Sequence, residues 1–223
     1  MSGAAHLPDG HVPDGHLPDG HVLYLHGFRS SPKSFKARVV QQRMEQLGCA
    51  SKLICPQLPA SPRAAMELVL TLVERHRDKL AIVGSSLGGF YATWLAERFG
   101  CRAVLINPAV DPLKDLDKHV GVTTAWHSDE PFEFKREYID ELADLRVARI
   151  TRPERYFLLA ATGDEVLDYR DMVAHYAGAR QHVIEGSDHA VSEFEQYVDE
   201  VLAFCGIETD ASTRAVAGSD IAS

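Results

Sequence analysis

The sequence predicts an α/β fold in which helices cover both faces of a parallel sheet. Short segments that are nearly all apolar alternate with segments whose apolar residues recur at helical spacing. Strands that are apolar on both sides are typical of a parallel sheet buried between helices. The 223 residues are 45% hydrophobic and 25% charged, which suits one globular domain and excludes wholesale disorder, collagen-like repeats and coiled coils.

Six apolar segments are the expected strands. The first is 22–25, which ends at His26-Gly27, and the second is 52–55, which Pro56 stops. The others, in chain order, are 80–83, 103–106, 156–161 and 181–184. Because strands and helices alternate, we expect these six strands to form one mainly parallel sheet.

Helical segments separate the strands. Ser31-Pro32 opens a segment that we expect to be helical to about Gly48, with the proline in its first turn. Two further helices each present one apolar face, formed by Met66, Val69, Leu70 and Val73 in the first and by Leu87, Phe90, Tyr91, Trp94 and Leu95 in the second. The last helix places inward Val191, Phe194, Val198, Val201 and Leu202, with Gly206 as its C-cap.

Residues 111–150 interrupt the alternation. We expect no strand there and one helix from about Phe134 to Val147. The segment is too long for an ordinary loop, so we interpret it as a small lid inserted after the fourth strand. It concentrates four aromatic residues, Trp126, Phe132, Phe134 and Tyr138, which are candidates to line a substrate pocket.

Both ends of the chain differ from residues 21–207, which form the predicted domain. Residues 1–20 contain three copies of a five-residue unit, HLPDG or HVPDG, whose period matches neither helix nor strand. Its histidines could bind a metal, but a flexible tail would lose much entropy on closing around an ion, so we expect no specific site. Residues 208–223 are mostly small or polar and are predicted to be a second flexible tail.

Charge and cysteine content limit the partners. Lys and Arg number 23 against 32 Asp and Glu, a net charge of −9, which disfavours binding to nucleic acid or anionic lipid. No apolar run reaches the roughly 18 residues of a membrane-spanning helix, and no secretory signal is evident. The four cysteines are far apart in the sequence, so we expect reduced thiols in a cytoplasmic protein. Its oligomeric state stays open.

The third strand leads into Gly84-Ser85-Ser86-Leu87-Gly88, which fits G-x-S-x-G with Ser86 in the centre. In a strand–turn–helix context this motif is the nucleophile turn of the α/β-hydrolase fold. The tight turn requires small residues and leaves the Leu87 N–H at the positive end of the next helix, where it can bind an oxyanion. The alternative is a nucleotide-binding turn, but neither G-x-G-x-x-G nor a Walker lysine is present.

A serine nucleophile needs a base and an acid, which follow it in that fold in the order Ser, Asp or Glu, His. His189 comes after the sixth strand and is the candidate base. Asp164 comes after the fifth strand and is the favoured acid. Its alternatives are Glu165, Asp168, which is expected to cap the next helix, and Asp188, whose side chain should point away from the base.

The loop after the first strand should supply the second oxyanion donor. The Phe28 N–H is the candidate, because Gly27 makes it approachable. We expect His26 to brace this loop by hydrogen bonding. Arg29 is a candidate to bind an anionic substrate, although an exposed arginine more often faces only solvent.

Five segments together resemble the YqiA-type esterases, which are small α/β-hydrolases: LYLHGFRSSP, GSSLGGFYATWLAE, LINPAV, TGDEVLDYR and GSDHAVSEFE. The resemblance covers about residues 22–207 in matching order. It implies a triad of Ser86, Asp164 and His189, hydrolysis of carboxylic esters or acyl-CoA thioesters, and no metal or organic cofactor. The N-terminal repeat has no counterpart in the family pattern.

Three functions therefore follow from the sequence. The first is a serine esterase acting through an acyl-enzyme on a small-molecule ester. The second is an acyl-CoA thioesterase with the same triad, for which basic residues at the pocket mouth, such as Arg29 or Lys135-Arg136, would be needed. The third is a non-catalytic binding protein with a hydrolase fold, which an incomplete triad would favour.

Overall fold

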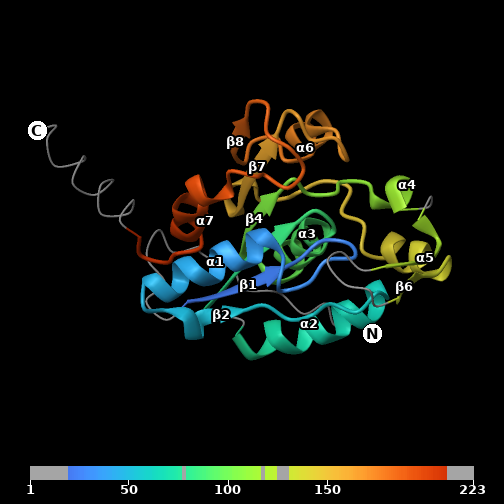
Figure 1. The fold of residues 1–223 in the computed structure, drawn as a ribbon, viewed down its shortest axis with the longest axis horizontal. Helices are drawn as coiled ribbons and strands as arrows, with labels where there is room; N and C mark the ends of the chain where they lie inside the picture. Colours follow the sequence, from blue (N-terminus) through green and yellow to red (C-terminus); the bar gives the residue numbers. More distant parts are fainter. Residues whose placement is uncertain (1–19, 77–78, 117–118, 125–130, 210–223) are drawn as a thin grey trace, which may run out of the picture.

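A computed structural model describes residues 20–76, 79–116, 119–124 and 131–209 (Figure 1). Six strands form one sheet: β1 (His21–Leu25), β2 (Leu53–Ile54), β3 (Leu80–Ser85), β4 (Arg102–Ile106), β7 (Tyr156–Ala161) and β8 (Arg180–Ile184). Their order is β2-β1-β3-β4-β7-β8, and every neighbouring pair is parallel. The predicted six-stranded α/β-hydrolase sheet is confirmed. All of its strands therefore end at one edge, where a site can form.

Helices cover both faces of this sheet, as Figure 1 shows. One face is covered by α1 (Phe35–Gln46) and α7 (Val198–Phe204), which pack side by side. The other is covered by α2 (Pro62–His76), α3 (Leu87–Phe99) and α6 (Tyr169–His175). Fully described 3₁₀ turns lie at Ala50–Lys52, Pro153–Arg155 and Phe194–Gln196.

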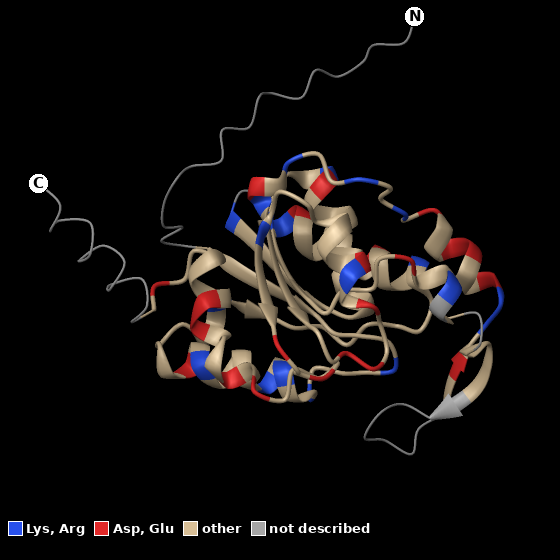
Figure 2. Ribbon diagram, turned by 90° about the horizontal axis from the view of Figure 1, so that it is seen from above, with Lys and Arg blue, Asp and Glu red and all other residues tan. Residues whose placement is uncertain are grey.

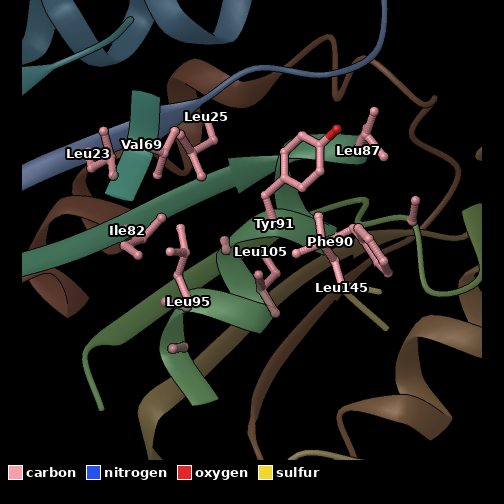
Figure 3. Close-up of a cluster of buried hydrophobic side chains, with 14 of the residues drawn as sticks. Leu23, Leu25, Val69, Ile82, Leu87, Phe90, Tyr91, Leu95, Leu105 and Leu145 are labelled. Carbon is pink, nitrogen blue, oxygen red and sulfur yellow. The ribbon is translucent and has the colours of Figure 1, made fainter. Parts of the chain in front are cut away.

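Alternate residues of each strand enter two separate cores. Val22 and Tyr24 pack towards α1 and α7, whereas Leu23 and Leu25 pack towards α2 and α3. Figure 3 shows the second core, in which leucines and Ile82 of the sheet meet Phe90 and Leu95 of α3. This double burial explains why the central strands β1, β3, β4 and β7 are almost wholly apolar, whereas the edge strand β8 is largely polar and partly exposed. In Figure 2 the charged residues lie mainly on helices and loops, and the centre of the sheet carries none.

The inserted segment (residues 111–150) differs from the prediction. It contains α4 (Pro112–Leu116), strands β5 (Gly121–Thr124) and β6 (Pro131–Phe134), and α5 (Glu137–Ala143). The expectation of no strand was wrong, because β5 and β6 form a separate antiparallel pair instead of joining the apolar sheet. The alternation of Phe132, Glu133 and Phe134 is the period of a strand with one buried side. Because β6 runs to Phe134, the helix that was expected to begin there begins at Glu137 instead.

Two predicted helices are also shorter in the structure. The first starts at Phe35, because residues 27–34 form two successive turns, with Ser30 N–H bonding Gly27 C=O and Ser34 N–H bonding Ser31 C=O. The last is divided into a 3₁₀ turn and α7, although the five residues expected to face inward are all buried. Gly206 has the expected left-handed conformation at its end, with φ 81°.

Most of the predicted tails, 1–20 and 208–223, lies outside the described residues. Within those residues, no helix combines the length and the apolar character needed to cross a membrane.

Candidate active site

Ser86 lies at the turn between β3 and α3, with its backbone in a strained conformation of φ 54° and ψ −122°. Hydrogen bonds on both sides hold the turn. The Ser86 N–H donates to Ile106 C=O at 3.0 Å, and its C=O accepts from the Gly89 N–H at 2.9 Å. The neighbouring β4 and the first turn of α3 therefore fix the serine at the carboxyl edge of the sheet.

Glycines allow the chain to pack this closely. A Cβ on Gly88 would lie 2.0 Å from the carbonyl oxygen of Leu25, and a Cβ on Gly84 would lie 2.4 Å from that of Gly88. No side chain fits at either position. Gly27 approaches the serine itself, since a Cβ there would lie 3.0 Å from Ser86 Cβ. The loop after β1 thus packs directly on Ser86.

His189 and Asp164 form a hydrogen-bonded pair. The imidazole Nδ1 lies 2.7 Å from Asp164 Oδ2, and the Asp164 side chain is 1% exposed. The other carboxylate oxygen, Oδ1, accepts the N–H groups of Val166 at 2.8 Å and Leu167 at 2.9 Å. These backbone donors fix the carboxylate, which in turn orients the imidazole and leaves its Nε2 available on the opposite side.

The three other acidic candidates are used differently. Asp168 caps α6 by accepting the Arg170 N–H at 2.9 Å, as predicted. Asp188 accepts bonds from the Ser192 hydroxyl at 2.6 Å and its N–H at 3.0 Å, which hold the pKa of that carboxyl below its usual value. Glu165 accepts the backbone N–H of His189 at 3.0 Å. Among these four acids, Asp164 contacts the imidazole.

A cavity of about 390 Å³ opens beside these groups. Ser86 and His189 both line it, as do three other residues singled out in the sequence, Phe28, Arg29 and Leu87. Apolar side chains dominate the rest of the wall, among them Phe35, Ala109, Leu116, Val166 and Leu167. An apolar wall next to a hydroxyl and an imidazole suits an organic substrate with an apolar portion.

The predicted aromatic residues of the inserted segment lie behind this wall. Phe132 and Phe134 pack edge-to-face on Phe28, with ring centroids 5.2 and 5.0 Å away. Phe134 is fully buried, and Tyr138 packs on it at 5.5 Å. None of these three lines the cavity, and two of them contact its wall at Phe28. Trp126 lies outside the described residues.

His26 is buried and braces the loop after β1. Its Nδ1 lies 3.0 Å from Gly27 C=O, and its Nε2 accepts the Leu58 N–H at 3.1 Å. This pattern assigns the proton to Nδ1. Burial lowers the pKa of His26, which favours the neutral ring that this pattern needs. These bonds agree with the predicted bracing role.

Sequence reasoning missed two residues that hold the histidine loop (residues 185–193). Asn107 is fully buried after β4, and its Nδ2 donates to the carbonyls of Asp188 and His189, both at 3.1 Å. Its Oδ1 accepts the Ala161 N–H at 2.8 Å. Lys36 of α1 donates to the carbonyls of His189 and Ala190. Asn107 follows directly after a predicted strand, at the sheet edge where the site lies, and this position could have indicated its role. No feature of the sequence around Lys36 indicated its contact with the histidine loop.

Residues 20–76, 79–116, 119–124 and 131–209 contain no group of three or more His, Cys, Asp or Glu side chains placed to hold a metal ion.

Solved structures share this fold. A candidate hydrolase from Agrobacterium vitis S4 superimposes with a TM-score of 0.64 at 19% identity, covering 86% of this chain and 90% of that one. One structure from a study of the metagenome-derived lipolytic enzymes LipS and LipT gives 0.62 at 16%, covering 83% and 92%. Est1E from Butyrivibrio proteoclasticus, with ferulic acid bound, gives 0.59 at 13%, covering 82% and 88%. These likenesses show an α/β-hydrolase fold.

A family model matches the chain from residue 21 to residue 206, which is nearly the whole described domain. The match includes the segments with Ser86, Asn107, Asp164 and His189, and it confirms the resemblance drawn from the motifs. The chain therefore belongs to the uncharacterised protein family UPF0227, the family of the YqiA-like esterases.

Proposed function

We propose that this protein is a serine hydrolase that cleaves carboxylic esters, with Ser86 as nucleophile, His189 as base and Asp164 as the acid that orients it. One observation carries the proposal. The His189 imidazole is bonded to a buried carboxylate, and it lines the same apolar cavity as a serine on a strained turn. This combination supplies the three roles that acyl transfer requires.

The reaction proceeds in two halves. Ser86 Oγ attacks the ester carbonyl while His189 Nε2 takes its proton, and the imidazolium then protonates the departing alcohol. The acyl group stays on Ser86 until water, deprotonated by His189, releases it as the carboxylic acid and restores the serine. Asp164 remains ionised and stabilises the imidazolium throughout.

The oxyanion is held by the N–H groups of Leu87 and Phe28. Leu87 is the first residue of α3, so its N–H lies in the turn where a helix provides no internal acceptor. Phe28 lines the cavity next to Gly27, whose close approach to Ser86 supports this role. Removing such a donor typically costs about 10²–10³ in kcat.

The cavity favours an ester with a modest apolar acyl group. Its wall is mainly aliphatic and aromatic, while Arg29, Lys36 and Glu165 add charges of both signs. Charges of both signs do not favour binding of the strongly anionic CoA group of a thioester. An ester is therefore the proposed substrate, and the thioester becomes a comparison in the test.

The test is covalent labelling combined with a substrate series. Wild type should bind one fluorophosphonate per chain and should hydrolyse p-nitrophenyl esters with a higher kcat/KM than the matching CoA thioesters. Ser86→Ala should lose both activities, whereas Ser30→Ala, at another serine of the cavity, should keep both. Wild type that takes up no probe and cleaves no ester would instead be a binding protein.

A further inference from the structure

The main chain of His189 is held by residues from distant parts of the sequence. Its C=O accepts Lys36 Nζ at 3.2 Å and Asn107 Nδ2 at 3.1 Å, and its N–H donates to Glu165 at 3.0 Å. Lys36 also donates to the C=O of Ala190 at 2.9 Å. Lys36 and His189 are 153 positions apart, so this contact joins α1 to the histidine loop across the sheet edge.

The charge of Lys36 is not used in an ion pair. In the described part of the chain its ammonium contacts carbonyl oxygens and no carboxylate. Burial lowers the pKa of Lys36 to about 8, although Asp164, Asp188 and Glu165 act in the opposite direction. Lys36 is half-buried and lines the cavity, so its ammonium gives up part of its hydration and receives two carbonyl oxygens in exchange.

We propose that Lys36 is a positioning residue for His189: its ammonium clamps the carbonyls of His189 and Ala190 and so holds the imidazole at the reach and angle that proton transfer from Ser86 requires. The inference rests on the proposed function, since it assigns a task within the same site. Asn107 holds the loop from the sheet side, and Lys36 holds it from α1. The Asp164 bond holds the ring at Nδ1, and the bonds from Lys36 and Asn107 hold the main chain that carries it.

The consequence is a specific kinetic signature. Without the clamp, substrate binds as before, but the imidazole is less often aligned, so kcat falls about tenfold or more while KM stays within about twofold.

The experiment compares Lys36→Met, Lys36→Arg and Lys33→Met in the full chain. Lys33 is an exposed lysine three positions earlier, so its substitution is the matched control. Lys36→Met should show the kcat loss at nearly constant KM with a Tm close to that of wild type, because the lysine is only half-buried. Lys36→Arg keeps a cationic donor and should lose less. Lys33→Met should match wild type in every measurement.

Hydrogen exchange of the histidine loop gives a readout that needs no activity. Backbone amides of residues 188–191 should exchange faster in Lys36→Met than in wild type or Lys33→Met. Faster exchange would support the contact between Lys36 and the histidine loop even if wild type cleaves no ester. A lack of esterase activity would contradict the proposed function alone.

Three outcomes would overturn the positioning role. The first is a wild-type kcat in Lys36→Met, and the second is a KM increase at constant kcat, which would assign Lys36 to substrate binding. The third is a kcat loss that merely follows a lower Tm, with no change in loop exchange. If Lys36→Met does not fold, Lys36→Gln is judged by the same criteria.

Discussion

Two loops at the same edge of the sheet hold Ser86 and His189, and they are stabilised in different ways. The serine turn is held locally, by its own glycines and by backbone bonds to β4 and α3. The histidine loop is held by side chains from three distant segments, through Lys36, Asn107 and Glu165. The strained turn at Ser86 can therefore be specified by one short motif, whereas the position of His189 depends on the assembled domain.

The difference fits the chemistry of each residue. Ser86 must stay fixed above the sheet, so steric exclusion of side chains is sufficient. In the proposed reaction, His189 exchanges protons with Ser86, the leaving group and water in turn, so both ring nitrogens must be correctly oriented. Polar contacts to the main chain and to Nδ1 provide that orientation.

The largest expected effect comes from removing either partner of the reaction. Ser86→Ala and His189→Ala should each lower kcat by about 10⁴ or more, and the double variant should be no worse, because the two loops act as one unit. Steady-state hydrolysis of a p-nitrophenyl ester measures this, with circular dichroism to verify folding. Additive losses in the double variant would mean that the two loops contribute independently.

Gly88→Ala tests the close packing that holds the serine turn. Its Cβ would lie 2.0 Å from the Leu25 carbonyl oxygen, so β1 or α3 must move, and we expect a loss of more than about 4 kcal/mol in the free energy of unfolding. Gly48→Ala is the control, since that glycine has φ 69° and no atom within 4 Å of the added Cβ. It should cost about 1–2 kcal/mol. Urea unfolding measures both, and equal costs would contradict the steric argument.

Asp164→Asn tests the side-chain contacts that hold His189. The amide cannot stabilise the imidazolium, so kcat should fall by about 10³ with little change in Tm. Asp188→Asn, on the residue before His189, should stay within about tenfold of wild type, because among the described residues that carboxylate is hydrogen-bonded by Ser192 and not by the imidazole. A near-normal Asp164→Asn together with an inactive Asp188→Asn would reverse the assignment of the acid.

The smallest effect is expected from the inserted segment. Phe132→Ala removes an edge-to-face contact on Phe28, so kcat/KM should fall about threefold to tenfold, with a changed preference for acyl chain length. Val122→Ala, at an exposed position of the paired strand β5, should leave both properties unchanged. If Phe132→Ala lowers Tm without altering the chain-length profile, the segment only packs on the domain.

The sequence by itself determined the sheet and the serine turn. Apolar strands predict double burial, and G-x-S-x-G predicts a turn too tight for side chains, because both are properties of a few consecutive residues. The order Ser86, Asp164, His189 was equally available, since parallel strands bring successive loops to one edge. The β5–β6 pair was missed because two four-residue strands pair only with each other.

Only the tertiary structure decided how the base is held and where the aromatic residues lie. Phe132 and Phe134 were expected at a substrate pocket, but their i and i+2 positions on a strand direct them onto Phe28. Lys36 looks like any helical surface lysine in the sequence, and its contact with His189 joins residues 153 positions apart. Contacts across such separations depend on how the helices pack on the sheet, which no local pattern of residues encodes.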